Sequence, residues 1–421
     1  MKQQTVPFSS YQKLAITLLA LTQFSVILDF MIMSPLGDLL MKSMHLKPNQ
    51  FSIVVSAYAF SAGISGLLTA GFADRFDRKK LLLFFYCGFI LGTLCCGLAH
   101  TYVMLVAARI VTGLFGGVIG SISMAIITDL FKLEQRGRAM GFIQMGFGAS
   151  QVLGIPISLY FADTWGWEAP FLMVVGLATV IALVILIKMK PVTAHLAIQH
   201  DKTALTHLWH TFKKRNYRIG FLATALLSIG GFMMMPFGSA FAVNNLHIRQ
   251  EDLMWLFMAS GLGSLVIMPI AGKLSDRMDK FKLFSYCSLF LMVMVVVYTN
   301  LTPAPFAIIV ILNILMMAGV LGRMVPATTL TSAVPDMADR GAFMSINASL
   351  QQIAGGVAAA IAGLIVVKET ETSPLKHYDI VGYVMVVLTI PCIYMVYRVS
   401  KLVRDKMNKK APAEAPAMME A

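Results

Sequence analysis

The chain has 421 residues, of which 57% are hydrophobic and only 13% are charged. A soluble domain carries about 25% charged residues, so this chain lacks the polar side chains that would cover a soluble protein of its length. Apolar segments of roughly 18 residues or more recur along the sequence, and each can cross the hydrocarbon core of a bilayer. The composition therefore excludes a soluble globular protein and predicts an all-α membrane protein with many spans.

The net charge of +13 comes from 34 basic and 21 acidic residues. The five cysteines lie inside apolar segments and show no metal-ligand spacing, so they are interpreted as small core residues. The 30 methionines form no recurring pattern with cysteine or histidine that would indicate copper. We therefore expect neither a metal nor a cofactor.

The apolar segments form two sets of six. The first set covers 12–40, 50–73, 81–99, 103–130, 138–162 and 168–190. The second covers 217–244, 252–275, 282–301, 304–333, 341–367 and 378–402. A polar, basic segment separates the sets, and an Ala/Pro-rich tail follows them. The predicted organisation is an N-terminal six-helix bundle, a cytoplasmic linker, a C-terminal six-helix bundle around a shared central cavity, and a disordered cytoplasmic tail: 1–190, 191–216, 217–402 and 403–421.

The distribution of basic residues predicts the orientation of the spans. Of the 34 Lys and Arg residues, five fall in the outer loops and two inside spans if the N-terminus is cytoplasmic, which leaves 27 on the cytoplasmic side. Cytoplasmic loops are enriched in Lys and Arg in this way. We therefore place both termini in the cytoplasm, expect the inner or plasma membrane, and interpret the positive charge as a topology signal rather than as a nucleic-acid site.

Two charged fragments in equivalent places indicate an internal duplication. The first, "AGFADRFDRKKLLL", starts at Ala70, and the second, "AGKLSDRMDKFKLF", starts at Ala271. Asp74 and Asp276 within them lie 202 residues apart. Weaker sequence similarities before and after these fragments have nearly the same offset, so the second six-helix unit repeats the first.

Two sets of six spans, a basic linker and a charged loop after the second span resemble the major facilitator superfamily over about 12–402. The loop motif of that family runs Gly, three residues, Asp-Arg, one residue, Gly-Arg-Lys. Here Asp74-Arg75 and Arg78 fit the motif, while Ala70 replaces the first glycine and Asp77 the second. The second copy has Asp279 at the same place. The resemblance implies a conformational latch at the cytoplasmic surface, formed by Asp74, Arg75, Arg78, Asp276 and Arg277.

Two further segments resemble motifs of this family. The fourth span contains "RIVTGLFGG", which fits an Arg-x-x-x-Gly pattern at Arg109 and Gly113. The fifth contains "GFGASQVLGIPISLYF", which resembles the Gly/Pro-rich helix of proton-coupled antiporters, although Ile155 separates Gly154 from Pro156. The resemblance favours the drug- and metabolite-efflux branch and makes Gly113, Gly154 and Pro156 candidate helix hinges.

Three ionisable residues lie inside predicted spans, where a charge costs at least a few kcal/mol. Asp29 in the first span and Arg109 in the fourth have similar depths in the outer half, given a rise of about 1.5 Å per residue. An Asp29–Arg109 pair is therefore possible. It is interpreted as a proton-coupling site, because Arg109 and the proton would compete for the carboxylate; the alternative is a structural ion pair.

Arg323, in the tenth span, lies deeper towards the cytoplasm and has no evident carboxylate partner in its half. It is interpreted either as a site for an anionic substrate group or as a structural charge. Other polar span residues are candidates for lining the cavity or for hydrogen bonds between helices; they are Gln144, Gln151, Asn347 and Gln351. Asp38, near the outer end of the first span, is interpreted as an interfacial helix cap.

These observations predict a secondary active transporter, not an enzyme, that works by alternating access. Proton-coupled efflux of a small organic substrate is the leading hypothesis, with the substrate, protons and the bilayer as the only partners of a monomer. The alternative is a symporter or uniporter that imports a sugar, nucleoside or organic acid. A receptor or an intramembrane enzyme is a third hypothesis, but the sequence offers neither a protease dyad nor a soluble domain.

Overall fold

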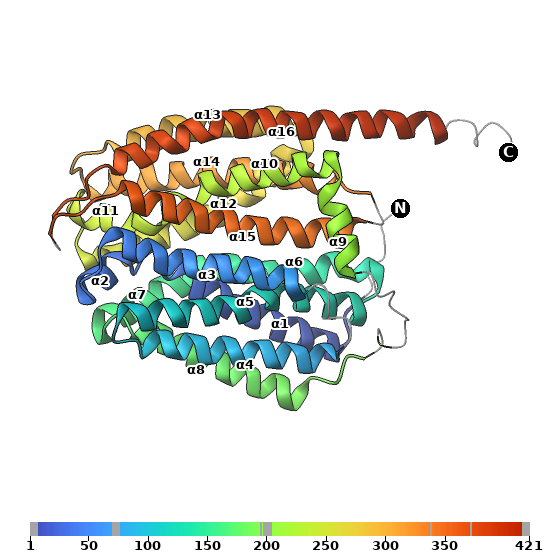
Figure 1. Ribbon diagram of the computed structural model, residues 1–421, viewed down its shortest axis with the longest axis horizontal. Coiled ribbons are helices and arrows are strands. Elements are labelled where there is room, and N and C mark those ends of the chain that lie inside the picture. Colours follow the sequence, from blue (N-terminus) through green and yellow to red (C-terminus); the bar gives the residue numbers. More distant parts are fainter. Residues whose placement is uncertain are drawn as a thin grey trace.

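The computed structural model describes residues 7–69, 76–193, 196, 204–336, 339–370 and 373–414. It is helical almost throughout, and twelve helices in this part are long and apolar enough to cross a membrane. The long helices run side by side along one direction of the molecule (Figure 1). The predicted fold class, an all-α protein with twelve spans, is confirmed.

The first six spans are formed by residues 10–188. The fifth span is a composite of α6, a π-helical turn and α7. The elements are α1 (Ser10–Met31), α2 (Gly37–Ser43), α3 (Pro48–Thr69), α4 (Arg78–Gly97), α5 (Tyr102–Leu130), α6 (Leu133–Ala149), η2 (Ser150–Gly154), α7 (Ile155–Trp165) and α8 (Ala169–Lys188).

The last six spans follow the amphipathic helix α9 (Ala204–Lys213). The elements are α10 (Arg215–Phe232), η4 (Met235–Phe237), α11 (Gly238–Asn244), η5 (Gln250–Asp252), α12 (Leu253–Arg277), α13 (Lys280–Thr299), α14 (Phe306–Ser332), α15 (Arg340–Ile365) and α16 (Tyr378–Glu414). We call the end of the bundle where α2 and α11 lie the distal end, and the end with α9 and the end of α16 the terminal end (Figure 1).

The first span of each half is interrupted at the same place. The break between α1 and α2 contains Pro35, and η4 between α10 and α11 contains Pro236. Proline has no N–H to donate and its ring clashes with the preceding turn, so a straight helix does not continue through it. The two halves therefore share a local distortion as well as a sequence pattern.

The tail differs from its prediction. The sequence predicts disorder from 403, whereas α16 continues to Glu414; residues 415–421 lie outside the described part. The segment "KLVRDKMNKK" consists mainly of good helix formers.

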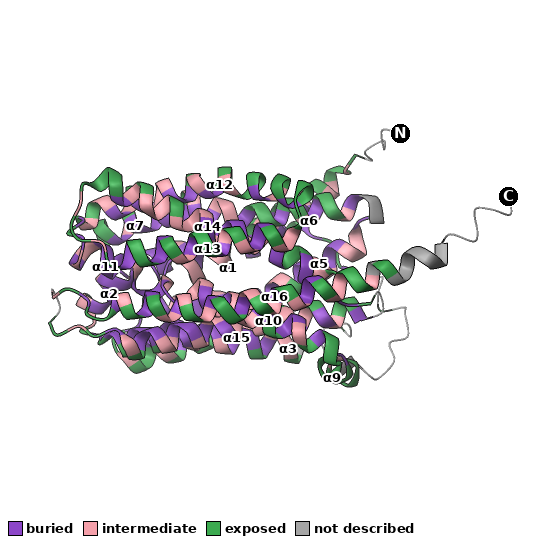
Figure 2. Cartoon of the chain, turned by 90° about the horizontal axis from the view of Figure 1, so that it is seen from above, coloured by how far each residue is buried: buried purple, intermediate pink, exposed green. Residues whose placement is uncertain are grey.

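The two halves meet along α3 and α15, which pack together more extensively than any other pair of helices. Small residues allow the close approach: a Cβ added to Gly63 would lie 2.9 Å from the carbonyl oxygen of Ser349, and one added to Gly356 would lie 3.2 Å from Cβ of Ala59. Without a hydrophobic driving force in lipid, helices associate through such close packing. Buried residues accordingly lie on the inner faces of the helices (Figure 2).

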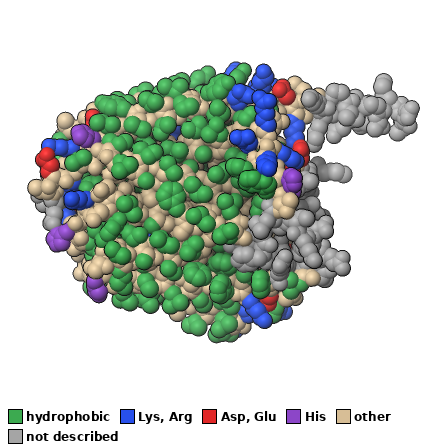
Figure 3. All heavy atoms as spheres, viewed as in Figure 1, with side chains coloured by type: hydrophobic (Ala, Val, Ile, Leu, Met, Phe, Trp, Pro, Cys, Tyr) green, Lys and Arg blue, Asp and Glu red, His purple; other side chains and the backbone are tan. Residues whose placement is uncertain are grey.

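The outer surface of the bundle is apolar. Figure 3 shows hydrophobic side chains across its middle and charged side chains gathered towards the two ends. Side chains that are exposed well inside their helices include Leu91 (60%), Val180 (59%) and Val293 (62%). Monomeric soluble proteins rarely expose contiguous apolar patches above a few hundred Å², so this belt fits a lipid environment.

Candidate functional site

Asp29 and Arg109 form a fully buried ion pair between α1 and α5. Nη1 of Arg109 lies 2.8 Å from Oδ2 of Asp29, and both side chains are 0% exposed. The hydroxyl of Thr93 on α4 donates to Oδ1 of Asp29 at 3.3 Å. The guanidinium of Arg109 also lies over the ring of Tyr58 on α3, 4.5 Å from its centroid. The pairing predicted from helix depths is therefore present, and four helices of one half enclose it.

Glycines bring the helices around this pair close together. A Cβ added to Gly113 on α5 would lie 2.1 Å from Oγ of Ser61 and 2.4 Å from the carbonyl oxygen of Tyr58. A Cβ added to Gly92 on α4 would lie 2.6 Å from Oγ1 of Thr112. Gly113 thus lets α5 approach α3 closely enough for Arg109 to stack on Tyr58. Its predicted role as a hinge stays a prediction.

The fifth span is distorted where the sequence places its Gly/Pro-rich motif. Residues Ser150–Gly154 form the π-helical turn η2, and Pro156 lies in the first turn of α7. A Cβ added to Gly154 would lie 2.6 Å from Cδ1 of Leu28, the neighbour of Asp29 in the chain. Single π-turns inside helices are frequent at functional sites. The motif therefore packs against α1 at the residue before Asp29, and its role as a hinge stays a prediction.

Arg323 lies alone in the interior of the C-terminal half. It is 1% exposed, and Nη1 reaches Oγ1 of Thr389 on α16 at 3.5 Å. Among the described residues, Nε and Nη2 have no hydrogen-bond partner, and no carboxylate forms an ion pair with this guanidinium. The prediction that Arg323 lacks a partner in its own half holds for the described residues, and none reaches it from the other half.

The other predicted cavity residues do not form one cluster. Gln151 is buried in η2 and Asn347 is half-buried on α15, and the side-chain oxygen of each lacks a hydrogen-bond partner. Gln351 is half-buried and Gln144 is exposed. Within the described part of the chain, none of these four side chains is hydrogen-bonded to another. They line several helix faces rather than a single polar pocket.

The predicted latch is only partly visible. Asp74 and Arg75 lie outside the described residues. Arg78 is buried at the start of α4, and its Nε lies 3.3 Å from Oδ2 of Asp129 at the end of α5, in the same half. Asp276 and Arg277 are exposed at the end of α12. The latch therefore stays a prediction.

Asp77 and Asp279, which replace a motif glycine, are helix N-caps. The carboxylate of Asp77 accepts a hydrogen bond from the backbone N–H of Lys79 at 2.9 Å, and Asp279 accepts one from Lys282 at the same distance. Their φ angles are −54° and −57°, so neither needs the conformational freedom of glycine. Aspartate just before a helix is a strong capping signal, and the sequence interpretation did not use it.

Asp38 is the residue that sequence reasoning misjudged. Instead of capping a helix at the membrane surface, its side chain is 1% exposed and lies between the two halves. It pairs with Lys42 at 2.6 Å and accepts a hydrogen bond from Nδ2 of Asn244 in α11 at 2.5 Å. Nζ of Lys368, which follows α15, lies 3.3 Å from Oδ1, the oxygen that also accepts from Asn244. Two residues of the C-terminal half therefore hold this carboxylate at the distal end.

Equivalent positions of the two halves contact each other around Asp38. The hydroxyl of Ser34 donates to the carbonyl oxygen of Met235, and the backbone N–H of Asp38 donates to the hydroxyl of Ser239 at 3.4 Å. Each of these contacts joins residues 201 apart in the chain. Contact between repeat-equivalent residues is expected on the axis that relates the two halves. The distal end is thus closed along this axis.

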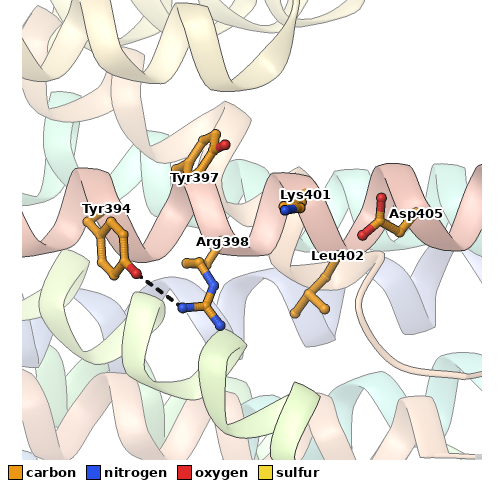
Figure 4. A pocket seen from close by; sticks show the side chains of 6 residues that line it. All are labelled: Tyr394, Tyr397, Arg398, Lys401, Leu402 and Asp405. Carbon is orange, nitrogen blue, oxygen red and sulfur yellow. Dashed lines mark hydrogen bonds between the residues drawn. The ribbon is translucent and has the colours of Figure 1, made fainter.

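A separate hollow of about 370 Å³ lies on the surface of α16. Tyr394, Tyr397, Arg398 and Lys401 line it, and Nη1 of Arg398 donates to the hydroxyl of Tyr394 at 3.1 Å (Figure 4). The side chains come from one helix near the terminal end. The hollow therefore lies apart from the buried charges between the helices.

Comparison with known proteins decides the family. The family model described as "Major Facilitator Superfamily" matches residues 19–359 and 220–418. The chain belongs to the Major Facilitator Superfamily. It is accordingly a member of a family of secondary transporters rather than of an enzyme family.

Curated relatives match parts of the chain. The uncharacterized MFS-type transporter YceJ of Bacillus subtilis is 25% identical over 254 residues, 60% of this chain and 65% of that protein. The vacuolar membrane amino acid uptake transporter fnx2 of Schizosaccharomyces pombe is 37% identical over 134 residues, 32% of this chain and 23% of that protein. The chain thus spans less than two thirds of both relatives. YtbD of Bacillus subtilis, also an uncharacterized MFS-type transporter, is 24% identical over 89% of this chain and 92% of that protein.

Solved structures share the fold. A bacterial homolog of the human lysosomal transporter Spinster, in an inward-facing and unoccupied conformation, has a TM-score of 0.76 and 14% identity over 95% of this chain and 99% of that chain. A D-xylose–proton symporter has a TM-score of 0.73 and 15% identity over 91% and 97%. At these identities the similarity establishes the fold alone.

Proposed function

We propose that this chain is a secondary active transporter that exports a small organic compound in exchange for protons. The observation that carries the proposal is the buried Asp29–Arg109 pair. A carboxylate without access to water favours its neutral form, whereas an adjacent guanidinium favours its charged form. The two influences oppose each other, so a change in helix packing or in substrate occupancy shifts the protonation of Asp29.

Protonation of Asp29 also changes the forces between helices. The ion pair joins α1 to α5, and a proton on Asp29 removes the charge that compensates Arg109. A buried charge that loses its partner costs about 3–5 kcal/mol. Helix rearrangement that hydrates Arg109 or brings an anion to it lowers this cost. Proton binding is thereby linked to conformation, as antiport requires.

Alternating access would move the two halves around a site near the middle of the bundle. In the present state the Asp38 contacts hold the distal end closed. In the opposite state, the latch of Asp74, Arg75, Arg78, Asp276 and Arg277 would close the terminal end. Gly113, Gly154 and Pro156 would adjust the helices, and Arg323, Gln144, Gln151, Asn347 and Gln351 would line the cavity.

The positive charge of the predicted inner loops supports a transporter with both termini in the cytoplasm. Export would then run outward across the inner or plasma membrane, driven by protons that move inward. The multidrug resistance protein fnx1 of Schizosaccharomyces pombe, 30% identical over 145 residues, and the probable sugar efflux transporter of Helicobacter pylori, 25% identical over 178, are consistent with export. We place the protein in the membrane as a monomer.

The test is a proton-flux measurement in liposomes that contain only this protein. The lumen is acidic and holds the pH dye pyranine, and the external probes are ethidium, glucose, alanine and benzoate. Antiport predicts that at least one probe makes the lumen more alkaline, and that Asp29→Asn abolishes the change. Asp252→Asn, which alters the exposed Arg249–Asp252 ion pair outside the site, is the matched control and should retain it.

Symport, the second candidate, has the opposite sign in the same experiment because the probe and the proton enter together. Uniport gives probe uptake with no pH change. Antiport is contradicted if every transported probe acidifies the lumen or leaves it unchanged, or if Asp29→Asn transports protons as the unchanged protein does.

A further inference from the structure

The guanidinium of Arg323 has unused hydrogen-bonding capacity in a buried place. Its Nε and Nη2 atoms, which lie on one edge of the planar fork, have no hydrogen-bond partner among the residues that the structure describes. A cation at this depth costs at least a few kcal/mol unless something compensates it. Thr389, its one hydrogen-bond partner in the described part, contributes a neutral hydroxyl at 3.5 Å. The compensating charge must therefore come from outside these residues.

The repeat identifies the place where a carboxylate is missing. The offset of 201 residues that relates Ser34 to Met235 and Asp38 to Ser239 leads from Asp29 to Gly230. A Cβ added to Gly230 would lie 3.0 Å from Nη2 of Arg323. In the N-terminal half, a carboxylate thus faces a buried arginine. In the C-terminal half, a glycine, which has no side chain, faces a buried arginine.

The next residue in the chain after Gly230 faces open space. A Cβ added to Gly231 would meet no atom within 4 Å, and Gly231 is half-buried on α10. The backbone of α10 therefore packs against Arg323 at one residue and faces open space at the next. The position against the guanidinium and the position at open space are therefore neighbours in the chain.

We propose that Arg323 binds the carboxylate of a small organic anion, and that this anion is the substrate of the transporter proposed above. A carboxylate has two oxygens in the spacing that the Nε and Nη2 hydrogens of one arginine bind in parallel. Its single negative charge compensates the charge of Arg323, as the carboxylate of Asp29 compensates that of Arg109. The apolar residues around the break of α10, Met233 and Phe237 among them, are buried and suit an organic group better than a hydrated ion.

The test measures the thermal unfolding of the purified full chain in detergent without chloride. The probes are sodium acetate, lactate and benzoate, each compared with its uncharged amide, and sodium chloride. We expect at least one carboxylate to raise the unfolding temperature while its amide and chloride do not. Arg323→Gln should weaken this response at least tenfold in probe concentration, and Arg323→Lys, which keeps the charge but loses the fork, should give an intermediate value.

A pair of neighbouring glycines supplies a second test that does not depend on removing Arg323. Gly230→Asp places a carboxylate beside Nη2, so it should raise the unfolding temperature without any probe and abolish the response to carboxylates. Gly231→Asp adds the same charge one residue away, towards open space, and should retain the response. If Arg323→Gln does not fold, the comparison of Gly230→Asp with Gly231→Asp tests the proposal by itself.

Several results would overturn the proposal. These are an unchanged protein that responds to no carboxylate, an equal response to chloride, a full response in Arg323→Gln, or equal behaviour of the two glycine variants. The unfolding assay uses no proton gradient. Carboxylate binding without proton-linked flux would therefore contradict the antiport mechanism alone, and proton-linked flux of other probes without carboxylate binding would contradict this proposal alone.

Discussion

The two halves have the same helical frame but different chemistry at matching positions. Arg109 is the eighth residue of α5, and Asn313 is the eighth residue of α14, the corresponding helix of the second half. The repeat offset of 202 leads from Tyr58, which stacks on Arg109, to Ser260. Ser260 donates to Oδ1 of Asn313 at 2.7 Å, and Nδ2 of Asn313 donates to the hydroxyl of Tyr298 at 3.2 Å.

The difference shows that the two repeats of a duplicated bundle can have different roles. The neutral network around Asn313 is linked by hydrogen bonds between uncharged groups, so it does not respond to pH. The Asp29–Arg109 pair changes its charge balance with one proton, so it can respond to pH. The same contrast recurs at the distal end, where charged Asp38 faces its uncharged counterpart Ser239.

Removal of one partner from the buried ion pair should have the largest effect. Arg109→Gln leaves the Asp29 carboxylate buried without its counter-charge, which should lower the stability of the protein by about 3–5 kcal/mol at neutral pH. The double variant Asp29→Asn with Arg109→Gln resembles the neutral network around Asn313 and should recover part of the loss. Thermal unfolding in detergent measures both, and equal losses in the single and double variants would contradict the comparison.

Opening of the distal end should follow from Asp38→Asn. The amide removes the negative charge beside Lys368, whose side chain is only 5% exposed. Removal of one partner of a hydrogen-bonded ion pair in this setting should weaken closure by about 1–3 kcal/mol. A disulfide between Ser34→Cys and Met235→Cys reports closure, and cross-linking should be slower in the Asp38→Asn background. Ser239→Ala, at the equivalent position, is the matched control and should slow it less.

Disruption of the neutral network should have a moderate effect and no effect on coupling. Asn313→Leu leaves the hydroxyls of Ser260 and Tyr298 without a shared partner, and unpaired buried polar groups of this kind cost about 1–3 kcal/mol. The unfolding temperature should fall while the proton dependence of transport stays unchanged. A shift in the pH dependence would show that this network participates in coupling and would break the contrast between the halves.

At the terminal end of the bundle, acid should reduce the stability of the C-terminal half more than that of the N-terminal half. The effect should be small. Asp339, just before α15, accepts hydrogen bonds from Nζ of Lys214 at 2.5 Å and from the hydroxyl of Tyr217 at 2.7 Å, and His207 lies at 2.9 Å. These contacts, that of Lys214 first, hold the pKa of Asp339 well below its usual value. Because the folded pKa is depressed, the stabilisation is present at pH values above the unfolded pKa of about 4 and declines as the pH falls below it.

The measurement is the unfolding temperature between pH 3 and pH 7. The unchanged protein should lose stability towards pH 3, and Asp339→Asn should be less stable at pH 7 with a flatter profile. Gln135, the residue before the matching arginine in the first half, carries no charge, so Gln135→Ala should leave the slope unchanged. An Asp339→Asn profile parallel to that of the unchanged protein would contradict the assignment.

Much of the fold follows from local sequence patterns. The twelve spans, the duplication and the similar depths of Asp29 and Arg109 were predictable because helix rise is regular and because apolar length is set by bilayer thickness. The capping roles of Asp77 and Asp279 were also local, and attention to residues before helix starts would have identified them.

The sequence alone therefore determined the spans, their pairing into two repeats and the rare charges inside them. Only the tertiary structure decided which charges meet. Asp38 contacts residues more than 200 positions away, and Arg323 faces Gly230 rather than a carboxylate. Periodicity does not specify the rotation of each helix in a uniformly apolar chain, because lipid and protein interior are equally apolar. Close packing at small residues sets that rotation, and it exists only once all twelve helices are assembled.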